Sequence, residues 1–192
     1  MKLMQAFAFL CLAAFARPAA AEPLGPEAAR EVTQEAVADI LDALAERDFD
    51  RLAAHVGKGG LTVSPYVMLD VHDVLLDSEE VGRCAQEKRI RLWGYRDGSG
   101  DPIETTCERY FAQFVWDADY RKADEVLYNE PRQRGNEINN NHGFVRDAIV
   151  VELHLGGTAA MSGMDWKSLR LIFRQGEQGL SLVAITRDIW TI

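Results

Sequence analysis

The sequence has few cysteines and histidines, and it lacks the short motifs that mark common cofactor and metal sites. It contains three cysteines and four histidines in 192 residues. No C-x-x-C pair, no G-x-x-x-x-G-K-[ST] loop and no G-x-G-x-x-G loop occurs, which argues against zinc or redox motifs, P-loop nucleotide binding and dinucleotide binding. We therefore expect no cofactor and no metal.

The chain also lacks an excess of basic residues. It carries 30 acidic against 21 basic side chains, a formal net charge of −9. Nucleic acids and anionic lipids bind to basic faces, so neither is expected as a partner. Beyond the first residues, no run approaches the roughly 20 apolar residues that a membrane-spanning helix needs. We expect no membrane association once the leader is removed.

The first residues have the composition of a secretory leader. Lys2 precedes an apolar run over residues 4–15, and three alanines end at Ala21. This order of charge, apolar run and small residues predicts a signal peptide over residues 1–21, cleaved after Ala21. Cys11 would leave with the leader. The mature chain is therefore expected to be periplasmic or secreted.

Two cysteines remain in the expected mature chain, Cys84 and Cys107. An even pair in an exported protein predicts a disulfide. On the chain-entropy account, closing a loop of this length contributes about 3 kcal/mol of stability. The alternative is two free buried thiols.

The first half of the chain predicts two helices followed by a strand. Apolar residues recur at steps of three and four over residues 27–47, which indicates an amphipathic helix. Asp48 can cap a shorter second helix that ends before Gly57. Strand chemistry follows over residues 61–69, although Pro65 interrupts it, and residues 78–86 favour a short helix.

The central stretch, residues 89–116, predicts a strand, a tight acidic turn and a helix. Alternation over residues 90–94 indicates the strand, and residues 97–102 cannot continue it because they carry two glycines and a proline. Residues 105–108 read as a capping box that uses a threonine hydroxyl and the Glu108 carboxylate. Three aromatics follow at helical spacing and are expected to enter the core: Tyr110, Phe111 and Phe114.

The last third predicts an antiparallel meander. A short strand over residues 126–129 precedes a polar loop over residues 130–142, and strands follow over residues 148–155, 166–174 and 180–190. Helices followed by antiparallel strands predict an α+β fold with the helices packed on a curved antiparallel sheet. We expect one domain over residues 22–192.

Several segments of the chain resemble a known superfamily. The helix end at residues 45–52 and the closing hairpin at 166–190 are similar to the NTF2-like (SnoaL-like, cystatin-like) superfamily. A second set of segments is more closely similar to a family of exported bacterial proteins of unassigned function: Ser64-Pro65-Tyr66, Trp93-Gly94 with residues 97–100, Tyr110-Phe111, Tyr128-Asn129, Gly135-Asn136, residues 164–171 and residues 190–192. The resemblance implies a cone in which a bent sheet wraps a long helix. The superfamily holds enzymes, such as ketosteroid isomerase and scytalone dehydratase, beside binding domains, so fold alone does not decide activity.

Asp70 and His72, with Asp73 next to them, form the best acid/base cluster in the sequence. Histidine titrates near neutrality, and residues two apart share a face if a strand continues there. The alternative is that these residues form an exposed turn. A zinc site from His72, His142 and His154 is disfavoured because no two of them have a ligand spacing.

Aromatic and histidine side chains supply the candidate ligand contacts. We predict that Tyr66, Trp93, Tyr110, His142 and His154 line a pocket at the open end of the cone. The plainer interpretation is that most of the aromatics are core. For His154 the strand pattern places the side chain opposite the apolar face.

The turn after the central strand imitates a calcium loop. Asp97, Ser99 and Asp101 alternate, and Glu108 lies eleven residues after Asp97. Pro102 stands where the EF-hand loop needs a glycine turn, and a strand precedes the loop instead of a helix. A plain turn followed by a helix cap is the favoured interpretation.

Three functions are compatible with the sequence. The first is an exported domain that binds an unknown small ligand or a partner protein without chemistry. The second is an acid/base enzyme of isomerase, dehydratase or hydrolase type that uses Asp70 and His72 on a small molecule. The third is a structural homodimer formed through the sheet face. We favour the first.

Overall fold

The fold begins with two helices that make one layer. The computed structural model describes residues 23–177 and 179–190, so the expected leader and Cys11 lie outside the described residues. Helix α1 (Pro26–Glu46) starts with a proline, which is suited to the first helical position, and ends at Arg47 in the left-handed conformation. Helix α2 (Phe49–Ala54) follows, with Asp48 accepting the Arg51 backbone N–H as its cap (3.0 Å). Both predicted helices are confirmed.

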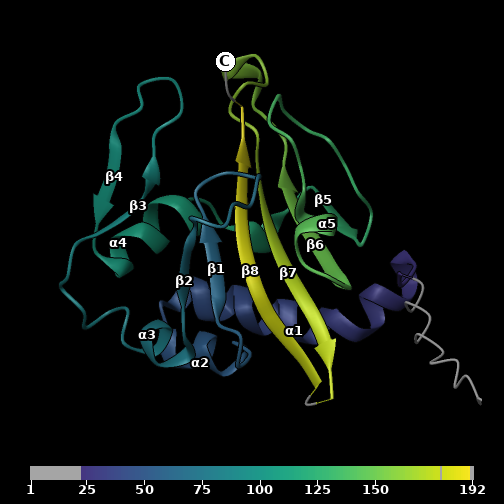
Figure 1. The fold of residues 1–192 in the computed structure, drawn as a ribbon. Helices are drawn as coiled ribbons and strands as arrows, with labels where there is room; N and C mark the ends of the chain where they lie inside the picture. The colour runs from purple at the N-terminus through teal and green to yellow at the C-terminus, as the bar shows by residue number, and fades with distance from the viewer. Residues whose placement is uncertain (1–22, 178, 191–192) are drawn as a thin grey trace, which may run out of the picture.

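A six-stranded sheet packs on α1, which crosses behind the strands in Figure 1. The strand order is β2-β1-β8-β7-β6-β5. The bounds are Leu61–Ser64 for β1, Val74–Leu76 for β2, Glu125–Tyr128 for β5, Ala148–Leu155 for β6, Lys167–Gly176 for β7 and Gly179–Ile189 for β8. The predicted α+β class, with helices packed on a curved sheet, and the meander β6-β7-β8 are confirmed.

The main sheet is antiparallel as predicted except at one pairing among the described strands. Strand β1 pairs in parallel with β8, with Val63 opposite Ile185. After β1 the chain leaves through β2, re-enters the sheet at its other edge as β5, and returns strand by strand. The last strand therefore comes alongside β1 in the same direction, which local sequence patterns do not encode.

The face of the sheet toward α1, here called the inner face, supplies most of the core. Alternate residues of β6, β7 and β8 point to it, and fully buried examples are Val151, Leu171 and Leu182. From α1, Ile40 and Leu44 pack on the same cluster. Burying each such side chain contributes roughly 1.5–3 kcal/mol, so the helix–sheet contact is the main source of stability.

Strands β3 (Arg91–Tyr95) and β4 (Pro102–Thr105) form a separate two-stranded sheet beside the main one (Figure 1). The predicted strand and turn are present, but β4 was not predicted because Pro102 is its first residue, a position where a strand tolerates proline. At the base of the hairpin, Trp93 stacks on Tyr110 with ring centroids 4.1 Å apart. Both side chains are buried.

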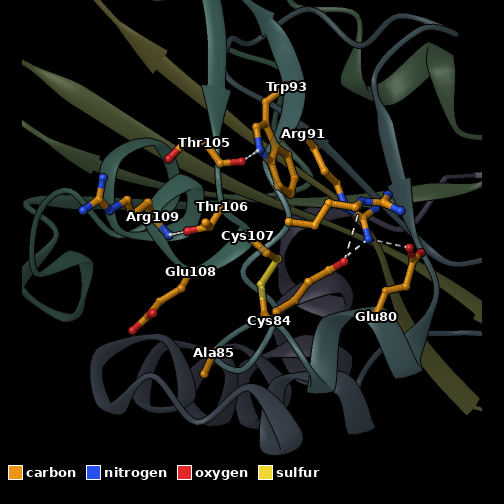
Figure 2. Close-up of a disulfide and its surroundings, with 12 residues drawn as sticks. Glu80, Cys84, Ala85, Arg91, Trp93, Thr105, Thr106, Cys107, Glu108 and Arg109 are labelled. Carbon is orange, nitrogen blue, oxygen red and sulfur yellow. Dashed lines mark hydrogen bonds and ion pairs between the residues drawn. A yellow bond between two sulfur atoms is a disulfide. The ribbon is translucent and has the colours of Figure 1, made fainter.

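The helix after β4 enters the core as expected, but its cap differs from the prediction. Helix α4 (Cys107–Tyr110) continues into a π-helical turn, η1 (Phe111–Val115), and Phe111 and Phe114 are buried. Thr106 is the N-cap and its hydroxyl accepts the Arg109 backbone N–H, so residues 105–108 form no capping box. Thr105 belongs instead to β4, where its carbonyl accepts the Trp93 indole N–H (2.9 Å; Figure 2).

Two other predicted elements are shorter than expected. Strand β1 stops at Ser64, because the proline that follows cannot donate to the ladder, and residues 65–73 form a loop. Helix α3 (Ser78–Gly82) ends four residues before the predicted end. It carries the capping box found in this region: Asp77 accepts the Glu80 backbone N–H (2.8 Å) and Glu80 accepts that of Asp77 (3.1 Å).

The predicted disulfide between Cys84 and Cys107 is present (Figure 2). It joins the segment after α3 to the first residue of α4, and both cysteines are buried. Arg91 of β3 reinforces the connection through ion pairs to Glu80 (2.7 Å) and Glu87 (3.0 Å). A disulfide of this kind is typical of proteins that fold outside the cytosol. Among the described residues, no helix is long and apolar enough to cross a membrane.

We expect the double substitution Cys84→Ala and Cys107→Ala to lower the free energy of unfolding by about 3 kcal/mol. The reason is that the bridge joins cysteines 23 positions apart and so reduces the conformational entropy of the unfolded chain. Guanidinium titration of both proteins measures this difference. A reducing agent should shift the wild-type midpoint and leave that of the variant in place. Equal midpoints for oxidised wild type and variant would show that the bridge does not stabilise the fold.

Candidate functional site

Two of the predicted ligand-binding aromatics belong to the core. Trp93 is 1% exposed and Tyr110 is 0% exposed. Burial raises the pKa of the Tyr110 hydroxyl well above its usual value, and the negative charge of Asp73 acts in the same direction. This hydroxyl has no hydrogen-bond partner among the described residues. A ligand reaches neither ring without displacing the hairpin.

The two candidate histidines line different cavities. His154 contacts the Ser168 hydroxyl (Nδ1–Oγ 2.9 Å) and borders an open hollow of about 270 Å³ beside Trp166. His142 borders a cavity of about 370 Å³ near the start of α1. Burial is the main cause that lowers the pKa of each ring, so both are neutral at neutral pH. The structure does not bring them together with each other or with Asp70.

Asp70 and His72 do meet, but in an exposed turn. The His72 Nδ1 lies 2.5 Å from Asp70 Oδ1, which also accepts the His72 backbone N–H (2.9 Å). The side chains are 90% and 51% exposed for His72 and Asp70, respectively. The backbone hydrogen bond from His72 lowers the pKa of Asp70, whereas a base that works near neutrality needs a raised one. Their predicted catalytic role stays a prediction that this geometry does not favour.

A cavity of about 450 Å³ lies at the end of β1, and we call it the Tyr66 cavity. Three segments form its walls: the loop after Ser64, the end of β3, and residues 136–138 of the loop that follows β5. The lining side chains that matter here are Tyr66, Met68, Asp70, Asp73, Tyr95, Glu137 and Ile138. Two predicted site residues, Tyr66 and Asp70, therefore share one cavity.

The position of β3 depends on Gly94. Its φ is +136°, and a Cβ at this position would lie 3.3 Å from the Pro65 ring. The missing side chain lets β3 pass close to Pro65, the residue that follows β1. A glycine thus sets the width of the Tyr66 cavity on this side.

Two carboxyl groups of the Tyr66 cavity have raised pKa values. Burial is the largest cause for both Asp73 and Glu137, and the charge of Asp97 adds to it for Glu137. The Tyr66 hydroxyl accepts the Asp97 backbone N–H (2.5 Å), and burial raises its pKa as well. Perturbed titratable groups that share a cleft are a physical mark of functional sites.

The loop that carries Glu137 is held by two asparagines that were not predicted as functional. Asn140 accepts the Leu69 backbone N–H and donates to the Leu69 carbonyl, both at 2.8 Å. Asn141, the first residue of α5 (Asn141–Phe144), donates to the Val67 carbonyl (2.7 Å) and accepts the Thr186 hydroxyl (3.0 Å). Residues 130–142, predicted as a plain polar loop, are thus fixed against the 65–73 loop and the sheet.

A buried charged network anchors the same loop at its other end. Arg134 donates to Glu152 on β6 (2.8 Å), and Glu152 also pairs with Arg170 on β7 (3.2 Å). Arg170 in turn donates to Asp188 on β8 (2.9 Å). Arg170, Glu152 and Asp188 are 1–4% exposed. They occupy the outer face, which is the sheet face opposite α1. The loop over residues 130–142 therefore covers these paired charges.

Sequence reasoning missed Glu137 and the network for the same reason. Glu137 stands in a stretch with no periodicity, and its place depends on contacts with residues about 70 positions away. The alternation of polar residues at Glu152, Arg170 and Asp188 was the available signal, and it also fits a solvated strand face. Within the described residues, no group of three or more His, Cys, Asp or Glu side chains could hold a metal ion.

Comparison with known proteins identifies no relative by sequence: no family model and no curated protein matches the chain. Among solved structures, the chain is similar to a candidate dehydratase of the NTF2-like family from Streptomyces avermitilis, with 12% identity and a TM-score of 0.37, covering 86% of this chain and 98% of that one. It is also similar to a candidate calcium/calmodulin-dependent protein kinase II association domain from Xanthomonas campestris, with 13% identity and a TM-score of 0.36, covering 89% and 96%. Likenesses this weak say nothing about activity or ligand.

We expect Asp73→Asn to stabilise the protein at pH 7 by up to about 1 kcal/mol, the range for a partly screened charge. A raised folded-state pKa means that stability is lost as pH rises through that pKa, so the wild type carries a cost at neutral pH that the amide removes. The difference should vanish below about pH 4, where the unfolded carboxyl is also protonated. Urea titrations at both pH values measure it.

The matched control is Glu35→Gln on the exposed face of α1, which should leave stability unchanged at both pH values. Equal stability of Asp73→Asn and wild type at pH 7 would show that Asp73 is not desolvated.

Proposed function

We propose that this protein is an exported, disulfide-tied binding domain that takes a small organic cation with an apolar body in the Tyr66 cavity. The observation that carries the proposal is the charge of the lining. Asp70, Asp73 and Glu137 are acidic, and no lysine or arginine lines this cavity within the described residues. A cation that displaces water there would be paired with carboxylates that are partly desolvated.

The size and the apolar walls support a small-molecule ligand. Ligand pockets typically enclose about 300–1,000 Å³, and the Tyr66 cavity has about 450 Å³. Met68, Tyr95 and Ile138 supply apolar area around the carboxyl groups. Tyr95 and Tyr66 offer ring faces, which attract cations. An amine or quaternary ammonium with an aromatic or aliphatic group fits this chemistry best.

Export is part of the proposal and rests on the leader and the disulfide. Residues 1–21 have the order of a signal peptide, and the buried Cys84–Cys107 bridge suits an oxidising compartment. Periplasm and medium both satisfy these two observations.

The second candidate function is acid/base catalysis in the same cavity. The raised pKa values of Asp73 and Glu137 favour it, because general acids and bases work best near the ambient pH. These two carboxyl groups are better placed for it than Asp70 and His72. Mass spectrometry of molecules that co-purify with the exported protein separates the two functions: an unchanged ligand supports binding, and conversion of that molecule on incubation supports an enzyme.

The third hypothesis, a homodimer through the sheet face, has less support. The outer face carries the Arg134–Glu152–Arg170 network and is covered by the loop over residues 130–142. Pairing through this face would require the loop to leave and expose buried charges, which costs several kcal/mol.

Titration calorimetry with three molecules of one skeleton tests the proposed ligand class: phenethylamine, phenethyl alcohol and phenylacetate. We expect the amine to bind most tightly and Glu137→Gln to weaken its binding about fivefold, since a partly screened ion pair contributes about 1 kcal/mol. Glu35→Gln on α1 serves as the control and should leave the affinity unchanged.

The pH dependence of amine binding adds a second readout. Because burial raises the pKa of Asp73 and Glu137, affinity should fall as pH drops through their raised values, above the usual range for carboxyl groups near pH 4. Equal affinities for the three molecules, or a fall in affinity with rising pH below neutrality, would rule out the proposed cation site.

A further inference from the structure

A second cavity lies at the opposite end of the sheet, where β6 begins, and we call it the Ala148 cavity. Its volume is about 370 Å³. Strands β1, β8 and β6 run in one direction, so the start of β6 and the end of β1 are at opposite ends. Leu24, Asn129, His142, Ala148, Ile149 and Gln175 line the cavity. It shares no residue with the Tyr66 cavity.

The edge of β6 is open at this cavity. Strand β5 pairs with β6 only as far as Tyr128, opposite Val151. Asn129 then turns the chain away with a φ of +55°. Its backbone N–H donates to the Val150 carbonyl (2.6 Å), and its side-chain oxygen accepts the Val150 N–H (3.2 Å). Toward the start of β6, Val150 is therefore the final residue whose backbone N–H and C=O are hydrogen-bonded by β5 or by Asn129, which follows it.

The ladder geometry fixes where the next backbone groups point. In an antiparallel ladder, the N–H and C=O of one residue point to the same side, and alternate residues point to opposite sides. The Val150 groups point toward Asn129, so the groups of Ala148 point to that side as well, past the end of β5. Ala148 lines the cavity there. The cavity thus offers one donor, the Ala148 N–H, and one acceptor, the Ala148 carbonyl. Ala148 lies two residues before Val150, toward the start of β6.

The side chains around this edge select against charged ligands. Ile149 is 4% exposed and forms an apolar floor with Leu24, whose carbonyl accepts the Asn129 side-chain N–H (2.7 Å). The His142 ring is neutral at neutral pH, because burial and the charge of Arg170 lower its pKa. Asp147 is the one charged lining residue among those described, and its side chain is 57% exposed at the rim. So exposed a carboxylate interacts weakly with an ion of either sign, and the apolar floor disfavours any charged group that would lose its water there.

We propose that the Ala148 cavity binds a neutral, largely apolar molecule that carries two secondary amides on one carbon, as a capped amino acid does, and pairs with the open edge of β6. The N–H of one amide donates to the Ala148 carbonyl, and the carbonyl of the other amide accepts the Ala148 N–H, because the N–H and C=O of a single trans amide point in opposite directions. The apolar body lies on Ile149 and Leu24. This is strand addition on the scale of a small molecule. It is independent of the cation proposed for the Tyr66 cavity, because the two sites share no residue.

The probe is N-acetyl-leucine N-methylamide, added to ¹⁵N-labelled protein that has been exported with its own leader. We expect the Ala148 amide resonance to move downfield on binding. The analogue with an acetoxy group in place of the acetylamino group lacks the N–H that faces the Ala148 carbonyl and should bind about 2- to 10-fold more weakly, the effect of one net hydrogen bond. N-acetyl-leucine, which is anionic, should bind more weakly than the amide.

Two variants and one control complete the test. Gln175→Trp places an indole at the rim from an exposed position and should abolish binding without disturbing the core. Ala148→Pro removes the donor itself. Ile138→Trp, which changes the Tyr66 cavity instead, should leave probe binding unchanged. An Ala148 resonance that does not move, or full affinity in Gln175→Trp, would overturn the proposal.

Discussion

The buried Arg170 side chain is the constraint on which the outer half of the structure depends. A guanidinium that is 1% exposed must have its charge paired and its donors satisfied. Glu152 and Asp188 do this from the neighbouring strands. Those carboxylates would still face water on one side of the sheet, and the loop after β5 closes that side with Arg134. The loop is therefore held in place because it excludes water from these paired charges.

Fixing that loop has consequences at both ends of the sheet. Arg134 holds its start, and the asparagine pair Asn140 and Asn141 holds its end against the chain after β1. Between these anchors the loop supplies Glu137 to the Tyr66 cavity, and just beyond them it supplies His142 to the Ala148 cavity. One covering segment thus shapes two chemically different cavities.

The sequence predicts the elements with local signals and fails where distant parts of the chain meet. The 3.6-residue pattern of α1, the alternation of β6 to β8 and the Cys84–Cys107 pair are each readable from near neighbours. The parallel pairing of β1 with β8 joins residues more than 120 positions apart, and no short pattern encodes it. Of the candidate site, Tyr66 and Asp70 were found by residue type. Glu137 was not, because its place depends on long-range hydrogen bonds. The side-chain amides of Asn140 and Asn141 make these bonds to the backbone of Leu69 and Val67.

The anchoring also bears on how ligands would bind. A site whose walls order only on binding loses affinity to the entropy of that ordering. Here the wall containing Glu137 is held at both ends. On one side, the Asn140 and Asn141 side-chain amides hydrogen-bond backbone groups at 2.7–2.8 Å. On the other side, Arg134 pairs with Glu152 in the charged network buried under the same loop. The disulfide and the Trp93–Tyr110 stack fix the hairpin that forms the facing wall. Both walls are thus preformed by interactions that no ligand has to supply, which suits a binding domain built on a rigid core.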